Sequence, residues 1–325
     1  MAMKIPDGDR VLAEVQLEPV QGYRFQPTGF PSLGAAEFTS MANEKDCVLV
    51  ESAQSMANRL EAVCWNKAEL RLTDVLTGMP VITVNDESNN FLTNSLLEAH
   101  RMNSSYMLEG EDKTLNDKIK TELSVEGAGP LQMSEFARFV FKYDPNSILH
   151  GLFLSRKEIA GGRYKMTRAL SSFVEAVNVR PVVSGGVKLD HVDPSGGDAG
   201  AELGFGHIPY SRTEYSAESI TAYFSIDLAL LRSYGLDDTA NDFLFTLALW
   251  KIRSFLKQGL RLRTACDLKT RQDIKTTQPK SMEIPDLKTL EKDVASLIKK
   301  CKARGLFVEE PLEIKCRRPK KAGKK

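Results

Sequence analysis

Polar side chains gather at the start of a predicted helix, and their types suit the binding of phosphate or hydroxyl groups. They are Ser52, Gln54, Ser55, Asn58 and Arg59. The unpaired N–H groups and the positive dipole end of a helix start attract such groups. Short hydrogen-bonding side chains add donors and acceptors beside them. An ordinary capped surface helix has the same composition, so this pattern leaves both interpretations open.

A second group of candidate ligand-binding residues lies in a basic stretch of the chain. Between Arg156 and Lys188 there are seven lysines or arginines against two acids, and between Lys251 and Lys275 there are eight against two. In the first stretch a glycine pair precedes basic residues, which is typical of a turn that binds a polyanion backbone. The candidates are Lys157, Arg163, Lys165 and Arg168. A solvated basic face would give the same pattern.

Aromatic and guanidinium groups that could stack on nucleobases lie in a glycine-rich segment at 182–217. They are Phe205, His207, Tyr210 and Arg212. We expect a mobile arm, because the segment is too rich in glycine to pack a core of its own. Stacking on such side chains contributes about 1 to 3 kcal/mol per base. The alternative is a disordered loop whose aromatic residues are incidental.

Metal and nuclease chemistry have little support in the sequence. Five cysteines are scattered singly and four histidines lack metalloprotease spacing, so we expect no metal and no cofactor. A nuclease centre could draw on Asp190, His191, Asp193 and Asp198. Neither a triad nor a paired-carboxylate spacing supports such a centre.

The composition predicts a cytoplasmic protein that can bury a substantial core. The chain has 325 residues, of which 42% are hydrophobic, and its net charge is +1. No apolar run approaches the length of a membrane span, so we expect no membrane partner. Unpaired cysteines fit a reducing compartment such as the cytosol.

The candidate residues near the N-terminus must be positioned by a strand, a loop and a helix. Residues 11–17 alternate between apolar and polar side chains, which predicts a strand buried on one face. Residues 22–38 hold two prolines and three glycines and are predicted to be a loop. The apolar run 48–50 precedes Ser52, which can cap a helix. The core face of that helix is Met56, Leu60, Val63 and Cys64.

Apolar periodicity predicts the remaining elements. We expect helices at 91–102, 164–179, from Asp237 or Asp238 to 258, and at 286–304, and strands at 147–154, 219–231 and 260–265. The helix at 164–179 depends on Leu170, Phe173, Val174 and Val177. The last strand places Arg261 and Arg263 on one face. We favour their pairing with Glu14, Glu18 or Asp227 over contact with phosphate.

These elements predict an α+β fold. Without insertions their order is β-α-β-β-α-β, which is the ferredoxin-like arrangement of RNA-recognition domains. The central ferredoxin-like unit, called the palm, would comprise residues 1–66, 147–181 and 218–275. The fingers-like insertion would be 67–146, the thumb-like arm 182–217, and the C-terminal helix and basic tail 276–325, with the tail from Lys315 disordered.

Two N-terminal motifs carry a resemblance to a known family. The stretches RFQPTGFPSLGAA (24–36) and VLVESAQSMANRLE (48–61) resemble the CRISPR-associated RAMP protein that forms the backbone of the type I-G (formerly I-U) Cascade effector. Ser52-Ala53-Gln54 is similar to the Ser-Ser-Gln stretch that opens the first helix of backbone subunits in other type I systems. Those subunits carry basic residues in the helix, whereas this sequence has Ala57 and Asn58.

The resemblance implies a non-enzymatic subunit that polymerises head-to-tail along CRISPR RNA (crRNA). Its partners would be crRNA, target DNA through the guide, copies of itself and other Cascade subunits. The resemblance assigns RNA-backbone contacts to Arg24, Gln26, Thr28, Ser52, Gln54, Asn58 and Arg59, and thumb contacts to Phe205, His207, Tyr210 and Arg212. Two alternatives are a RAMP endoribonuclease acting on crRNA or target RNA, and a nucleotide- or sugar-binding α/β enzyme, for which no phosphate-loop motif is present.

Overall fold

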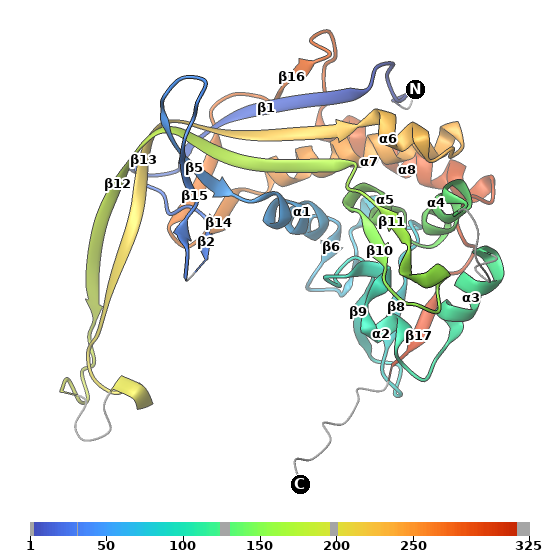
Figure 1. The fold of residues 1–325 in the computed structure, drawn as a ribbon, viewed down its shortest axis with the longest axis horizontal. Coiled ribbons are helices and arrows are strands. Elements are labelled where there is room, and N and C mark those ends of the chain that lie inside the picture. The colour runs from blue at the N-terminus through green and yellow to red at the C-terminus, as the bar shows by residue number, and fades with distance from the viewer. Residues whose placement is uncertain (1–2, 31, 124–130, 196–200, 317–325) are drawn as a thin grey trace.

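The fold is built on one antiparallel sheet whose strands come from both ends of the chain. The computed structural model describes residues 3–30, 32–123, 131–195 and 201–316. The sheet order is β14-β15-β1-β13-β12-β5-β4, and β16 also pairs with β1 (Figure 1). These strands are β1 (Arg10–Pro19), β4 (Glu37–Thr39), β5 (Asp46–Glu51), β12 (Leu170–Lys188), β13 (Ile208–Asp227), β14 (Leu260–Arg263), β15 (Cys266–Thr270) and β16 (Lys275–Gln278).

The predicted first strand is confirmed as β1, which lies between β15 and β13 in the interior of this sheet. Its apolar residues at alternate positions, including Val11 and Val15, are buried, and Val11 lies opposite Ile226 of β13. The strand predicted at 219–231 forms the second half of β13 and ends at Asp227. There the Asp227 side chain accepts a hydrogen bond from the Leu230 N–H and begins the short helix α6 (Leu228–Ser233).

Three helices lie on one side of the sheet (Figure 1), and each begins at a capping residue. The sequence predicted the cap Ser52 for the first helix and Asp237 or Asp238 for the second. Ser52 accepts from the Ser55 N–H at 3.2 Å and starts α1 (Ala53–Ala62). Asp237 caps the almost wholly buried α7 (Asp238–Lys257). Asp286 caps α8 (Leu287–Ala303), which packs on α7. A side-chain oxygen at each start satisfies an amide that has no partner within the helix.

The helix predicted at 164–179 is wrong, because these residues are strands. Tyr164–Met166 forms β11, and β12 begins at Leu170. Along β12 the side chains of Leu170, Val174 and Ala176 are buried. Phe173 on the opposite face stacks on Tyr223 of β13, with ring centroids 5.1 Å apart. The apolar residues fit both a helical and an alternating pattern, and pairing with β13 favours the strand.

Residues 182–188 and 208–217 of the predicted arm form the outer part of a long β-hairpin. β12 and β13 pair continuously from Leu170 opposite Ile226 to Lys188 opposite Ile208. The hairpin leaves the sheet and curves away from the body of the molecule (Figure 1). Hydrogen bonds between the backbones of the two strands stabilise the arm, so the arm does not need a hydrophobic core of its own.

Two other predicted elements are wrong. The apolar run 147–154 is not a central strand but the end of helix α5 (Pro145–His150), followed by β10 (Leu152–Leu154), which pairs with β11. Gly151 ends the helix with a φ of 86°, which favours glycine. The helix predicted at 91–102 is the strand β9 (Phe91–Asn94) followed by a 3-10 turn at Arg101–Asn103.

The predicted insertion and the C-terminus share a small sheet of order β17-β8-β9, with β8 (Thr83–Asn85) parallel to β17 (Glu313–Lys315). The region also contains β6 (Trp65–Asn66), β7 (Arg71–Leu72), α2 (Ser105–Leu108), α3 (Thr114–Leu123) and α4 (Met133–Tyr143). Its buried side chains join the same core as those of the main sheet. The domain boundaries stay a prediction. Of the basic tail, residues 317–325 lie outside the described residues.

A buried polar network joins α1, α5 and α7 beneath the sheet. Arg101 donates two hydrogen bonds to the Glu61 carboxylate, each at 2.8 Å, and Asn146 donates a third. The Lys251 ammonium, which is fully buried, contacts the Asn146 side-chain oxygen and lies 2.9 Å from His150 Nε2. Each buried charge therefore has a polar partner, which offsets the cost of removing it from water.

Candidate nucleic-acid interface

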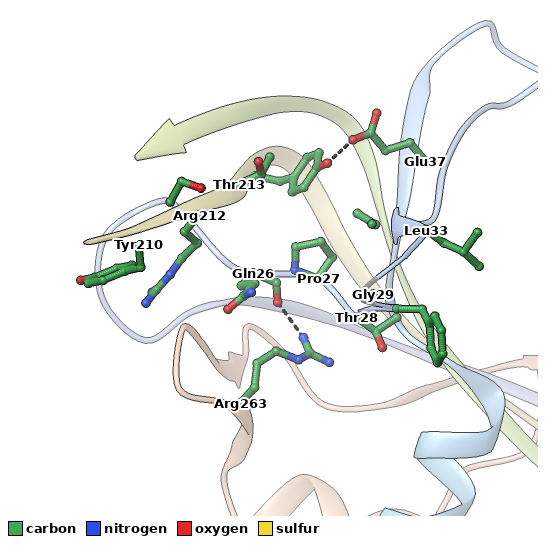
Figure 2. Close-up of a pocket in the computed structure, with 15 residues that line it drawn as sticks. Gln26, Pro27, Thr28, Gly29, Leu33, Glu37, Tyr210, Arg212, Thr213 and Arg263 are labelled. Atoms are coloured by element: carbon green, nitrogen blue, oxygen red, sulfur yellow. Dashed lines mark hydrogen bonds between the residues drawn. The ribbon is translucent and has the colours of Figure 1, made fainter. Parts of the chain in front are cut away.

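A hollow of about 1140 Å³ lies between the outer part of β13, at residues 210–215, and the loop that follows β1 (Figure 2). Gln26 and Thr28, predicted from the loop, line it together with Tyr210 and Arg212, predicted from the arm. The tertiary structure thus brings together two groups of predicted residues that are far apart in the sequence.

Backbone hydrogen bonds fix the loop on this side of the hollow. The Phe25 N–H donates to the Tyr215 carbonyl at 2.9 Å, and the Tyr215 N–H donates back at 2.8 Å. The Phe25 side chain is buried. The Gln26 and Thr28 amides donate to Ala265 and Val50. Buried and partly exposed residues alternate here, so Gln26 and Thr28 are at the surface.

Arg263 joins the loop to the end of β5 through hydrogen bonds. Its guanidinium donates to the Gln26 carbonyl at 2.6 Å (Figure 2), to the Val50 carbonyl at 3.1 Å and to the Glu51 carboxylate. The predicted partners of Arg263 were therefore wrong. Glu18 pairs with Lys269 and Arg271, and Asp227 pairs with Arg10. Arg261 is exposed.

Two arginines predicted to bind RNA share one carboxylate. Glu214 of β13 is buried and lies 3.3 Å from Arg24 and 3.7 Å from Arg212. The Arg212 guanidinium also lies over the Tyr210 ring, 5.7 Å from its centroid. A phosphate that contacted either arginine would compete with Glu214.

Phe205 and His207 come just before β13, at the outer end of the arm, and neither lines the hollow. Phe205 is exposed, and His207 Nδ1 accepts from the Asp190 N–H at 2.9 Å. The Asp190 carboxylate accepts from the backbone amides of Val192, Asp193 and Gly206, and these bonds lower its pKa. In this structure Asp190 organises the turn. Asp198 lies outside the described residues.

The polar residues of α1 form a second surface. Gln54 and Asn58 are exposed one turn apart, and the Gln54 amide donates to Asn58. Arg168 donates to the Ala53 carbonyl at 3.0 Å and to Gln54 Oε1 at 2.8 Å. Partial burial and the charge of Arg101 lower the Arg168 pKa. The Arg59 guanidinium donates a hydrogen bond to the Leu262 carbonyl and lies 3.6 Å from Glu51, so it also stabilises the contact of α1 with β14 and β5.

Lys157, Arg163 and Lys165 belong to a third surface, the β10–β11 ribbon, and all three are exposed. Phe153, at the centre of β10, is 49% exposed and lies directly opposite Lys165. We did not predict Phe153 as a functional residue. Its place in the sequence, just before the basic stretch that starts at Arg156, could have indicated an aromatic residue beside a polyanion-binding surface.

Glu37 and Tyr215 are two further lining residues of the hollow that the sequence did not suggest. The buried Tyr215 hydroxyl donates to the Glu37 carboxylate (Figure 2), and burial together with this bond raises the Tyr215 pKa to about 12. Because 178 positions separate the two residues, no local pattern could indicate the contact.

Within the described parts of the chain, no group of three or more His, Cys, Asp or Glu side chains is placed to hold a metal ion. Over the same residues, no helix combines enough length and apolar character to cross a membrane.

These observations define a class: an α+β protein with an antiparallel sheet, a long β-hairpin arm, and polar surfaces beside the arm and on its first helix. Residues 11–181 match the family described as CRISPR-associated protein GSU0053. The chain belongs to this family. No curated protein matches the chain.

Two solved structures are similar to this chain at low identity. One is titled "CRISPR RNA-guided surveillance complex, pre-nicking"; it has 14% identity and a TM-score of 0.39, covering 80% of this chain and 73% of that one. The other is Csc2 of Thermofilum pendens, with 8% identity and a TM-score of 0.34, covering 92% of this chain and 76% of that one.

Proposed function

We propose that this protein is the non-enzymatic backbone subunit of a type I-G Cascade effector, which binds crRNA and displays the guide for pairing with target DNA. Membership of a CRISPR-associated family supports a role in a CRISPR system. The observation that carries the proposal is the shared hollow, in which Gln26 and Thr28 meet Tyr210 and Arg212.

A guide can have any sequence, so its sugars and phosphates are the useful contacts. The three surfaces offer suitable chemistry. The α1 surface supplies Ser52, Gln54, Ser55, Asn58, Arg59 and Arg168. The hollow supplies Gln26, Thr28, Tyr210 and Arg212, and Arg24 shares Glu214 with Arg212. The β10–β11 ribbon supplies Lys157, Arg163 and Lys165. Neutral side chains outnumber available cations on α1. Hydrogen bonds to the RNA sugar therefore contribute more there than ionic contacts.

The palm in this proposal is ferredoxin-like. β1, α1, β12, β13, α7 and β14 with β15 follow one another in β-α-β-β-α-β order. The sheet order β15-β1-β13-β12, with α1 and α7 in contact on one side, supports the assignment.

The arm acts as a thumb that reaches into a neighbouring copy along the RNA. It projects from the body and carries exposed apolar side chains, among them Val192 at 95% and Leu203 at 73%. Such side chains are available for contact with a second copy. Head-to-tail contacts that do not close into a ring give an open helical filament, whose length the guide would limit. The assembly would form in the cytoplasm with other Cascade subunits.

The test is binding of single-stranded guide RNA over a series of salt concentrations. We expect affinity to fall with salt, with a logarithmic slope of about 0.7 per phosphate contacted. Electron microscopy of protein co-expressed with a CRISPR array should show filaments of repeated subunits. Protein that stays monomeric and does not bind long guides at low ionic strength would contradict the proposal.

The same preparation tests the enzymatic alternative. Labelled guide and target RNA incubated with Mg²⁺ should remain intact. Cleavage products that disappear in Asp198→Ala would show a nuclease.

A further inference from the structure

We infer that the hollow between the arm and the loop that follows β1 holds a ribonucleoside unit of the RNA, and that Glu37 accepts a hydrogen bond from its ribose 2′-hydroxyl. This inference rests on the proposed RNA binding. It assigns a contact that distinguishes RNA from DNA to a residue outside the predicted contacts.

The charges around the hollow do not favour a phosphate. Both arginines that line it already have carboxylate partners: Arg263 contacts Glu51, and Arg212 lies 3.7 Å from Glu214. Glu37 adds a negative charge on the lining. A phosphate inside the hollow would have to displace an existing ion pair and approach this carboxylate, whereas the base and ribose of a nucleotide are neutral and meet neither obstacle when its phosphates stay outside.

Glu37 is held in a position to accept a donor. The Tyr215 hydroxyl, on a side chain that is 2% exposed, donates to Glu37 Oε1. The raised Tyr215 pKa keeps this hydroxyl protonated and donating. Among the described residues, no other group bonds this carboxylate, so Oε2 is available to a ligand. A ribose 2′-hydroxyl is a donor that DNA lacks.

The remaining lining suits a base and a sugar. Phe30 and Tyr210 are 65% and 51% exposed, so either ring is available to stack on a base. Gln26, Thr28 and Thr213 offer neutral hydrogen-bonding groups around them. A volume of about 1140 Å³ accommodates a nucleoside, since pockets for small ligands span roughly 300 to 1,000 Å³.

The test compares a short guide RNA with its 2′-fluoro analogue of the same sequence, which keeps an RNA-like sugar but cannot donate from the 2′ position. We expect wild-type protein to bind the RNA about tenfold more tightly than the analogue. Glu37→Ala should lower this ratio severalfold while still binding the analogue, and the sugar contacts proposed at α1 should keep the ratio above one. Tyr215→Phe removes the hydroxyl that positions the Glu37 carboxylate but keeps the carboxylate itself. This variant should therefore give a ratio between those of the wild type and Glu37→Ala.

Glu310→Ala is the matched control, because it removes an exposed carboxylate outside the hollow and should keep the wild-type ratio. A wild-type ratio near one, or a ratio unchanged in Glu37→Ala, overturns the inference while RNA binding stands. Absence of RNA binding in the wild type overturns the proposed function as well. If Glu37→Ala changes the oligomeric state measured by sedimentation but leaves the RNA-to-analogue ratio unchanged, the hollow binds a second copy of the protein and the inference is wrong.

Discussion

The Arg168 guanidinium donates a hydrogen bond to Gln54 Oε1 at 2.8 Å and so joins two predicted RNA contacts that are 114 positions apart. A second bond, to the Ala53 carbonyl, fixes Arg168 against the first turn of α1. The arginine thereby adds a positive charge beside a helix start whose other exposed groups are neutral.

Arg168→Ala should weaken guide binding and lower the slope of log affinity against log salt. If Arg168 contacts one phosphate, the slope falls by about 0.7. The measurement is fluorescence anisotropy with labelled guide RNA over a salt series. Arg138→Ala is the control, because it removes an exposed arginine of α4. An unchanged slope in Arg168→Ala would remove this residue from the contact surface.

Glu214→Gln should strengthen guide binding and steepen its salt dependence. The substitution removes the carboxylate that Arg24 and Arg212 share, so both guanidiniums become available to phosphate. The slope should rise by about 0.7 for each arginine that gains a phosphate. Glu218→Gln on the same strand breaks an exposed pair with Lys45 and should leave the slope unchanged. Weaker binding in Glu214→Gln would mean that Glu214 orients the arginines for RNA.

Phe153→Ala should reduce affinity for single-stranded RNA by an amount that a stacked base accounts for, about 1 to 3 kcal/mol. The ring is 49% exposed beside Lys165, and its loss removes the stacking surface of the ribbon. Phe153→Tyr should retain binding, because it retains the ring. Phe38, also exposed, provides the aromatic control in Phe38→Ala. Equal losses in the two alanine variants would argue against a specific platform.

Arg101→Met should destabilise the fold by about 3 to 5 kcal/mol, because it leaves the buried Glu61 carboxylate without its cation. The double variant with Glu61→Leu should recover much of the loss, since both buried charges are then absent. Urea denaturation measures both effects. Arg10→Met breaks an exposed pair with Asp227 and should cost less than about 1 kcal/mol. A double variant no more stable than Arg101→Met would contradict this account.

Stability should fall as the pH falls below the ordinary pKa of histidine, because of His150. Burial, together with the charges of Lys251, Arg101 and Arg168, sets its folded pKa well below 6.5. Between the two values the unfolded chain binds a proton that the folded protein does not, so the free energy of unfolding decreases by up to about 1.4 kcal/mol per pH unit.

Urea denaturation between about pH 7.5 and about pH 5.5 checks this prediction. His150→Gln should flatten the dependence, whereas His100→Gln at an exposed site should preserve it. Asp144 has the opposite sign: burial raises its pKa, so its contribution to stability falls as the pH rises above the ordinary aspartate value. A wild-type slope that His150→Gln leaves intact would contradict the assignment to His150.

The elements that the sequence predicted correctly are those with unambiguous local signals. Ser52 and Asp237 each cap a helix through a side-chain oxygen, which depends on neighbours within three residues. The alternation in β1 could be recognised because its two faces differ in polarity. In contrast, the residues around 164–179 fit both a helix and a strand, and pairing with β10, β5 and β13 made the strands favourable.

The sequence alone therefore determined the capped helices, the first strand, and the residue types that could bind RNA, because these depend on near neighbours. Only the tertiary structure decided that Arg263 pairs with Glu51, and that Gln26 and Thr28 face one hollow with Tyr210 and Arg212. The reason is physical: these contacts form when β1, β5, β13 and β14 share a sheet, and the free energy that aligns them comes from burial spread over the whole core.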